Sequence, residues 1–183
     1  MAVSSPVCDF GWTAPDLTLP ATDGRLLSLA DLRGKTATLV IFMCNHCPYV
    51  ISALDRILRD ARDLQALGVG VAAINANDAA TYPADSFDNM VRLARQHDFA
   101  FPYLHDESQQ VARAYGAACT PEFFGFDADL GLQYRGRLDG GGRQARPDLR
   151  RDLFEAMRQI AETGQGPQDQ IPSMGCSIKW RAA

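Results

Sequence analysis

The chain lacks several features that would assign it to a special class of protein. It contains no apolar run approaching the roughly 18 residues that a membrane-spanning helix needs. Residues 1–12 include neither a basic segment nor an apolar core, so we expect no secretory signal peptide. Neither sign of charge dominates, since 18 Lys and Arg are interspersed with 22 Asp and Glu, and the net charge is only −4. These absences argue against a nucleic-acid or anionic membrane partner, and they predict a cytoplasmic protein.

Cysteine is scarce and unevenly spaced. The five cysteines are Cys8, Cys44, Cys47, Cys119 and Cys176. An odd number with only one close pair does not fit a secreted disulfide framework. In a reducing compartment, a Cys-x-x-Cys pair is more often catalytic or metal-binding than structural.

The close pair, Cys44 and Cys47, lies at a predicted junction between a strand and a helix. Residues 38–43 are apolar and rich in β-branched side chains, which predicts a buried strand. Beyond the pair, apolar residues recur at helical spacing: Ile51, Leu54, Leu58, Ala61 and Leu64. Pro48 suits a first helical turn, where its missing N–H costs nothing. The free N–H groups and the dipole of this helix would favour a thiolate, so the pattern predicts a redox-active dithiol.

The remaining elements predict a single α/β domain over residues 1–183. We expect a hairpin within 14–29, strands at 36–43, 69–74, 99–104, 123–126 and 132–138, and helices at 48–67, from 85 or 86, from 106 and at 147–163. Parallel core strands with an antiparallel hairpin at one side would be covered by helices on both faces. Residues 1–12 are expected to form a loose arm, and residues 165–183 a tail.

The motifs resemble a known superfamily. A strand, then Cys-x-x-Cys-Pro and a helix, and much later a Thr-Pro that opens a strand, resemble the thioredoxin fold. Four segments are similar to a peroxiredoxin-like family of the AhpC/TSA or redoxin type: Cys44-Asn-His-Cys-Pro-Tyr-Val50, residues 82–86, residues 120–124 and residues 172–180. The resemblance implies a mixed central sheet flanked by helices, with an N-terminal β-hairpin and a peroxiredoxin-type insert within residues 69–116.

The resemblance also implies roles for individual residues. Cys44 would be the exposed attacking thiol and Cys47 the buried resolving thiol. Thr120-Pro121 would match the cis-proline loop that faces the dithiol and shapes the substrate groove. No bound cofactor is implied, because the cysteines carry the electrons. The partners would be a disulfide substrate, either a protein or a small molecule, and an upstream thiol reductant such as a thioredoxin or glutathione system.

The sequence departs from both better-known relatives. Aligned on Cys47, the proline and threonine that precede the peroxidatic cysteine of a peroxiredoxin correspond to Val40 and Cys44. The hydroxyl that would help to position a peroxide is therefore absent. A typical thioredoxin has Trp before its first cysteine, where this chain has Met43. A typical thioredoxin also carries a buried acid in the preceding strand. Residues 38–43 contain no acid, so the sequence does not identify the group that accepts the proton of Cys47.

Several further residues have both a functional and a structural interpretation. His46, when protonated, would stabilise the Cys44 thiolate and make the disulfide more oxidising, or it would simply be exposed. Glu122 could be the missing proton acceptor or an ordinary strand residue.

The other candidates lie further from the pair or beside it. Cys119 could be a third thiol, but we favour a buried small apolar side chain. Cys176 could fold back over the site or merely pack. The remaining candidates are Asn45 and Pro48, which neighbour the cysteines, and Asp85, a helix cap or a residue that borders the cleft.

Three functions are compatible with these patterns. The leading hypothesis is a thiol–disulfide oxidoreductase. The alternatives are a peroxiredoxin-like antioxidant peroxidase and a non-catalytic redox sensor or binding module. Zinc bound by the dithiol with Cys119 or Cys176 is a further alternative, but zinc pairs usually sit on knuckle turns, so we expect no metal.

Overall fold

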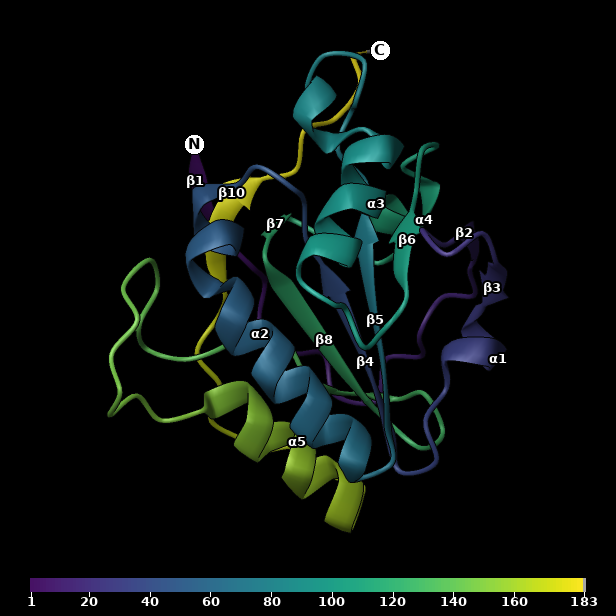
Figure 1. Cartoon of the computed structure of the whole chain (residues 1–183). Coiled ribbons are helices and arrows are strands. Elements are labelled where there is room, and N and C mark those ends of the chain that lie inside the picture. The colour runs from purple at the N-terminus through teal and green to yellow at the C-terminus, as the bar shows by residue number, and fades with distance from the viewer. Residues whose placement is uncertain (183) are drawn as a thin grey trace.

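The computed structural model describes residues 1–182, and a five-stranded mixed sheet lies at its centre (Figure 1). In order across the sheet the strands are β6 (Tyr103–His105), β5 (Val69–Asn75), β4 (Ala37–Phe42), β8 (Glu122–Asp127) and β9 (Leu132–Tyr134). β4 and β6 both run parallel to β5, whereas β8 is antiparallel to β4 and to β9. The predicted mixed sheet with a parallel core and an antiparallel hairpin at one edge is confirmed.

Helices cover both faces of the sheet. One face carries α2 (Pro48–Ala66), α3 (Phe87–Gln96) and α5 (Asp152–Thr163), and the other carries α1 (Leu29–Leu32) and α4 (Gln110–Ala114). The division follows from the alternation of side chains along a strand. All six residues of β4 are buried, with Leu39 and Ile41 packed towards α2 and Val40 and Phe42 towards the opposite cluster. A strand buried on both faces therefore has to be apolar throughout, as the sequence indicated.

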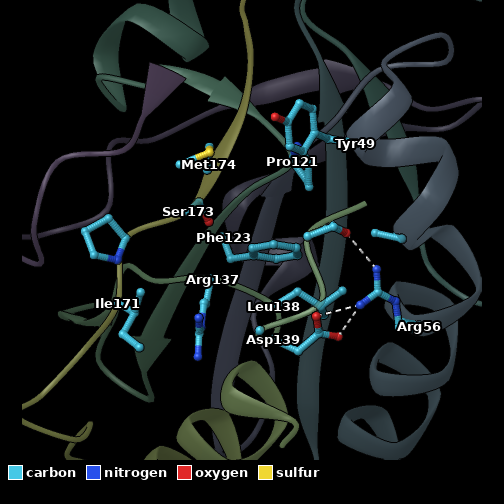
Figure 2. A pocket seen from close by; sticks show the side chains of 14 residues that line it. Tyr49, Arg56, Pro121, Phe123, Arg137, Leu138, Asp139, Ile171, Ser173 and Met174 are labelled. Atoms are coloured by element: carbon cyan, nitrogen blue, oxygen red, sulfur yellow. Dashed lines mark hydrogen bonds and ion pairs between the residues drawn. The ribbon is translucent and has the colours of Figure 1, made fainter. Parts of the chain in front are cut away.

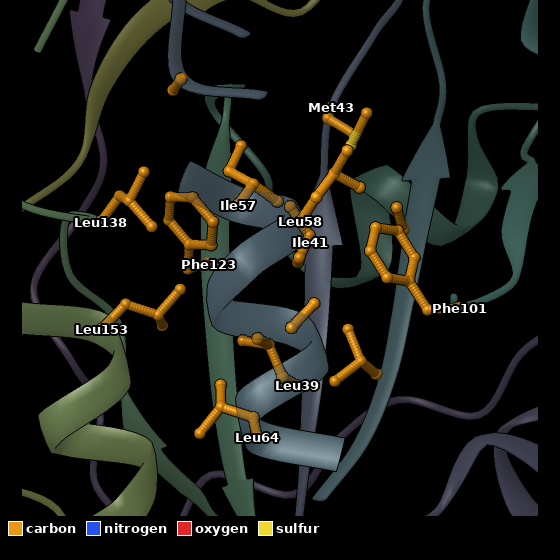
Figure 3. Close-up of a cluster of buried hydrophobic side chains, with 14 of the residues drawn as sticks. Leu39, Ile41, Met43, Ile57, Leu58, Leu64, Phe101, Phe123, Leu138 and Leu153 are labelled. Atoms are coloured by element: carbon orange, nitrogen blue, oxygen red, sulfur yellow. The ribbon is translucent and has the colours of Figure 1, made fainter. Parts of the chain in front are cut away.

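The larger of the two apolar clusters anchors the first helix after the cysteines. Figure 3 shows Ile57 and Leu64 of α2 lying over Leu39 and Ile41 of β4, with Leu153 of α5 beside them. Each such side chain contributes about 1.5–3 kcal/mol when it is fully removed from water. The N-terminus of α2 is thereby held at one end of the central strand.

The shorter elements largely follow the sequence signals. The expected N-terminal hairpin consists of β2 (Thr18–Pro20) and β3 (Leu26–Ser28). Ser28 caps α1, and Ser86 caps α3 by accepting a hydrogen bond from the backbone N–H of Asn89. A 3₁₀ turn, η1 (Pro83–Asp85), precedes α3. α5 begins at residue 152 instead of 147.

A small second sheet joins the two ends of the chain. β10 (Met174–Ser177) lies between β1 (Ala2–Ser4) and β7 (Cys119–Thr120), antiparallel to both. Figure 1 shows the yellow β10 beside the purple N-terminal strand, near the start of α2. The prediction of a loose N-terminal arm is therefore wrong for Ala2–Ser4. Its partner is distant in sequence, and a three-residue strand has no local signal of its own.

None of the helices within residues 1–182 combines the length and the apolar character required to cross a bilayer.

Candidate active site

The two cysteines lie where the sequence predicted, between the end of β4 and the start of α2. Cys47 is the N-cap residue of α2, and Pro48 occupies its first turn. Both Cys44 and Cys47 are only 1% exposed, so the expectation that Cys44 is exposed is wrong. His46, between the two cysteines, reaches solvent with a side chain that is 36% exposed.

The Thr120-Pro121 peptide bond is cis and faces the dithiol, as the resemblance implied. The carbonyl oxygen of Thr120 lies 3.3 Å from Sγ of Cys47 and accepts a hydrogen bond from this sulfur when it is protonated. The hydroxyl of the same threonine lies 3.5 Å from Sγ of Cys44. One residue at the end of β7 thus contacts both sulfur atoms.

Negative charge in this site is favoured on Cys47. A hydrogen bond from Cys44 lowers the pKa of Cys47 to about 4 against the opposing effect of burial, and Cys176, the backbone N–H of Val50 and Thr120 act in the same direction. The same hydrogen bond, together with burial and the charge of Asp85, raises the pKa of Cys44 well above its ordinary value. This distribution is the reverse of the expected one, because the N-terminus of α2 points at Cys47 while a carboxylate faces Cys44.

Asp85 is the buried acid of this site. It is fully buried at the end of η1, on a different element from the acid that a thioredoxin carries in its strand. Its Oδ2 lies 2.7 Å from Nδ1 of His46, a contact between oppositely charged groups when the imidazole is protonated, although the ring N–H is not in line for a hydrogen bond. Oδ2 also accepts a hydrogen bond of 2.7 Å from the amide of Asn77. The sequence placed Asp85 at the cleft border only as an alternative to a helix cap, and the cap is Ser86.

Asn45 holds the turn between the cysteines in place. Its backbone N–H donates to Oδ1 of Asp85 at 2.8 Å, and its side-chain amide donates to the carbonyl of Ala84 at 3.0 Å. The side-chain oxygen Oδ1 of Asn45 accepts a hydrogen bond of 2.8 Å from the hydroxyl of Tyr103. Burial raises the pKa of Tyr103 well above its ordinary value, so this hydroxyl stays protonated as a donor. The pattern of the sequence gave no reason to link Tyr103, a core residue of β6, to the site.

Two sequence candidates have other partners. Glu122 forms an ion pair of 2.6 Å with Arg135 and accepts hydrogen bonds from the backbone N–H groups of Ala118 and Cys119, so its oxygens are occupied away from the dithiol. Cys119 is fully buried, and burial raises the pKa of its thiol to about 12. These contacts favour the structural interpretation of both residues.

The tail folds back against the site. The backbone N–H of Lys179 donates to Oδ1 of Asn77 at 2.9 Å, and Asn77 in turn binds Asp85. The ammonium of Lys179 lies 5.8 Å from the centre of the Tyr82 ring, which stacks on His46. The C-terminal segment is therefore part of the wall around the dithiol.

The residue types present could also coordinate a cation. Sγ of Cys44, Nδ1 of His46 and a carboxylate oxygen of Asp85 all lie within 4.8 Å of one another. Thiolate, imidazole and carboxylate are zinc ligands, but structural zinc takes four of them. The separation of 2.7 Å between the His46 and Asp85 atoms also fits a direct contact between the two groups.

A cavity of about 240 Å³ opens beside the cis-proline (Figure 2). Tyr49 and Pro121 line the side nearest the dithiol, and Phe123 contributes to an apolar wall. A buried ion pair between Arg56 and Asp139, with atoms 2.5 Å apart, closes another side. The cavity is a candidate for the groove in which the part of a substrate next to its disulfide is held.

Comparisons with known proteins identify the family of the chain. The family model described as AhpC/TSA matches residues 10–135, so the chain belongs to the AhpC/TSA family. The thiol-disulfide oxidoreductase ResA of Geobacillus thermodenitrificans is 29% identical over 64% of this chain, which spans 63% of the length of that relative. A Mycobacterium tuberculosis protein named "Putative peroxiredoxin" is 25% identical over 63% of this chain and 68% of its own. The relatives named here are redox proteins, so the comparisons support a redox function at the level of the family.

Solved structures confirm the fold. A crystal structure of an uncharacterized conserved protein from Geobacillus kaustophilus is 42% identical, with a TM-score of 0.91, and the match covers 100% of this chain and 98% of that one. The thioredoxin domain of a thiol-disulfide oxidoreductase from Bacteroides vulgatus matches at a TM-score of 0.58 and 16% identity, covering 69% of this chain and 86% of that domain. The expected thioredoxin-like fold is confirmed.

Proposed function

We propose that this protein is a thiol–disulfide oxidoreductase whose attacking thiolate is Cys47. The observation that carries the proposal is the pair of cysteines at the N-terminus of α2, whose sulfur atoms both contact Thr120 before cis-Pro121. The lowered pKa of Cys47, caused first by the hydrogen bond from Cys44, supports Cys47 as the attacking thiolate. A thiolate that is largely ionised at neutral pH, with a second thiol beside it, has what disulfide exchange needs.

The reaction follows from the two sulfur atoms. The Cys47 thiolate attacks one sulfur of a substrate disulfide, a mixed disulfide forms, and the other substrate sulfur leaves as a thiolate that takes up a proton. Cys44 then gives up its proton and attacks Sγ of Cys47, which releases the second substrate thiol. The substrate gains two electrons, and the protein retains a Cys44–Cys47 disulfide that an upstream thiol reductant has to reopen.

Asp85 and His46 are the groups placed to handle the proton of Cys44. The hydrogen bond with Cys47, burial and the charge of Asp85 together raise the pKa of Cys44, so this thiol keeps its proton until the mixed disulfide has formed. His46 contacts Asp85 at 2.7 Å and reaches solvent, which gives the proton a route to water. Since both sulfur atoms are buried, a protein substrate gains access to Cys47 only when the covering residues move aside.

A peroxidase is the second candidate, because the AhpC/TSA family match and the low pKa of Cys47 both favour it. The Cys47 thiolate would attack one oxygen of the peroxide, the O–O bond would break, and the other oxygen would leave as hydroxide, which leaves Cys47 as a sulfenic acid. The Cys44 thiol would then condense with the sulfenic acid to form a Cys44–Cys47 disulfide and release water. Against this reading, Cys44 occupies the position of the threonine that a peroxiredoxin uses beside its cysteine.

The two functions separate in one set of assays. Insulin reduction and stopped-flow consumption of hydrogen peroxide are measured on the wild type, Cys44→Ser and Cys47→Ser, with Cys8→Ser as the control. Exchange activity predicts insulin reduction that is lost in Cys47→Ser and slow turnover of peroxide. Fast peroxide reduction without insulin reduction would overturn the proposal in favour of the peroxidase. The absence of both activities would favour the non-catalytic redox sensor or binding module.

A further inference from the structure

Cys176 lies next to the active site through the pairing of β10. Its Cα is opposite Thr120 on β7 and opposite Ala2 on β1. Thr120 is the residue that contacts both active-site sulfur atoms. The pairing register therefore places Cys176 directly beside the loop that faces the dithiol.

Gly175 brings the two strands unusually close. A Cβ atom at this position would lie 2.1 Å from the carbonyl oxygen of Thr120, a separation that no side chain tolerates. The approach fixes β10 against the residue before the cis-proline. A glycine immediately before the cysteine is thus needed to hold Cys176 where it is.

The pairing register places the side chain of Cys176 on the dithiol side of β10. Cys176 lies directly opposite Thr120, whose hydroxyl contacts Sγ of Cys44, and directly opposite residues of an antiparallel pair share one face. Cys176 also packs against the apolar cluster that contains Cys44 and Cys47. Cys176 and Cys44 thus approach Cys47 from different elements, Cys176 from β10 and Cys44 from the turn before α2. Cys176 is partly exposed, in contrast to the other two. Cys119, on the neighbouring strand, makes its one side-chain hydrogen bond to the carbonyl of Pro121.

We propose that Cys176 is a second resolving thiol, which attacks a mixed disulfide on Cys47. The proposal rests on the proposed exchange function. The Cys176 thiolate forms a bond to Sγ of Cys47, the bond from Cys47 to the substrate sulfur breaks, and the substrate leaves as a thiolate that takes the proton Cys176 gave up. The product is a Cys47–Cys176 disulfide, and the two electrons pass to the substrate as they do when Cys44 resolves.

Electrostatics after the first step favour this route. In the resting protein, burial and the neighbouring Cys47 thiolate raise the pKa of Cys176 to about 11. The contribution of Cys47 disappears once its sulfur is in a mixed disulfide, so the pKa of Cys176 falls: burial still raises it, and the cation of Lys179 lowers it. Cys44 keeps the opposing charge of Asp85. Because Cys176 is partly exposed, the resulting disulfide is also open to a thiol reductant.

The test uses an aromatic disulfide, dithionitrobenzoate, whose released thiolate is coloured. All proteins carry Cys8→Ser, which removes a thiol remote from the dithiol, and the protein with this change alone is the parent. The reduced, full-length parent is compared with two variants made from it, Cys44→Ser and the double variant Cys44→Ser with Cys176→Ser. Attack by Cys47 releases one coloured thiolate, and resolution by a second thiol releases another. We expect Cys44→Ser to release the second equivalent and the variant lacking both thiols to stop after the first.

Mass spectrometry of the same samples identifies the bond. After trypsin, a Cys47–Cys176 disulfide links the peptides 36–56 and 159–179, whereas a Cys44–Cys47 disulfide stays within 36–56. If Cys44→Ser keeps the aromatic adduct on Cys47 while the parent completes both steps, the inference about Cys176 fails and the proposed function stands. If even the parent forms no adduct on Cys47 and no internal disulfide, the proposed function itself fails.

Discussion

Nδ1 of His46 and Oδ2 of Asp85 are 2.7 Å apart, and this contact joins the turn between the two cysteines to the segment before α3. Asp85 is fully buried, whereas His46 is open to solvent. The carboxylate therefore faces Cys44 from the interior, and the imidazole lies between this carboxylate and solvent. Several expectations follow from this asymmetry.

The Asp85→Asn substitution should make Cys44 more reactive. It removes the negative charge that helps to raise the pKa of Cys44, so alkylation of Cys44 at neutral pH should become roughly tenfold faster, which is the effect of one pKa unit. The rate is measured with iodoacetamide in a Cys47→Ser background by mass spectrometry. Asp88→Asn, an exposed acid on α3, is the matched control. An unchanged rate at Cys44 would mean that the carboxylate does not act on this sulfur.

Cys47 should titrate as the acidic thiol. Its pKa, lowered to about 4, predicts thiolate absorbance in the ultraviolet across the whole range from weakly acidic to neutral pH. The signal should vanish in Cys47→Ser and persist, with a higher pKa, in Cys44→Ser, because the hydrogen bond from Cys44 is the largest cause of the shift. If the signal is lost in Cys44→Ser instead, the charge resides on the other sulfur.

The stability of the reduced protein should depend on this thiol. Between about pH 4 and pH 9 the unfolded chain keeps the proton of Cys47 and the folded chain does not, so the free energy of unfolding rises with pH across that window. The stabilisation is complete above pH 9 and is lost as the pH falls towards 4. The raised pKa of Cys44 adds no slope there, since this thiol is protonated in both states. Urea unfolding under reducing conditions should show the slope in the wild type and a smaller one in Cys47→Ser. Equal slopes would count against a depressed pKa.

Glu122→Gln should affect folding and leave the dithiol unchanged. Glu122 and Arg135 are both largely buried, and breaking such a pair from one side costs about 3–5 kcal/mol. We expect a lower urea midpoint together with an unaltered Cys47 titration. Asp129→Asn removes the exposed partner of Arg33 and should cost at most about 1 kcal/mol. A shift in the Cys47 titration of Glu122→Gln would restore Glu122 as a candidate proton acceptor.

The central strand, the first long helix and the position of the dithiol were predictable because their signals are local. Residues 38–43 are apolar throughout, and Pro48 marks the start of α2. The resemblance also identified Pro121 as the cis-proline. These features depend on short stretches of sequence or on a motif that the chain shares with known proteins.

The electrostatics of the site were not predictable in the same way. Asp85 reaches Cys44 only because η1 folds beside the turn that Asn45 holds, and no local pattern encodes that distance. The hydroxyl of Tyr103 looked like one more core aromatic until its contact with Asn45 was known. The charge on Cys47 likewise depends on tertiary neighbours, among them Cys176 from the far end of the chain.

The pairing of β1 with β10 has a mechanical consequence. Ala2 lies opposite Cys176 and Ser4 opposite Met174, so the two ends of the chain leave this ladder on the same side. Force that separates the ends would load the hydrogen bonds of the ladder one after another, as in opening a zipper, because antiparallel bonds run perpendicular to the strands. The buried sheet around β4 would still be intact when β10 comes away from Thr120. Opening of this ladder would thus withdraw β10 from Thr120, the residue that contacts both sulfur atoms of the dithiol.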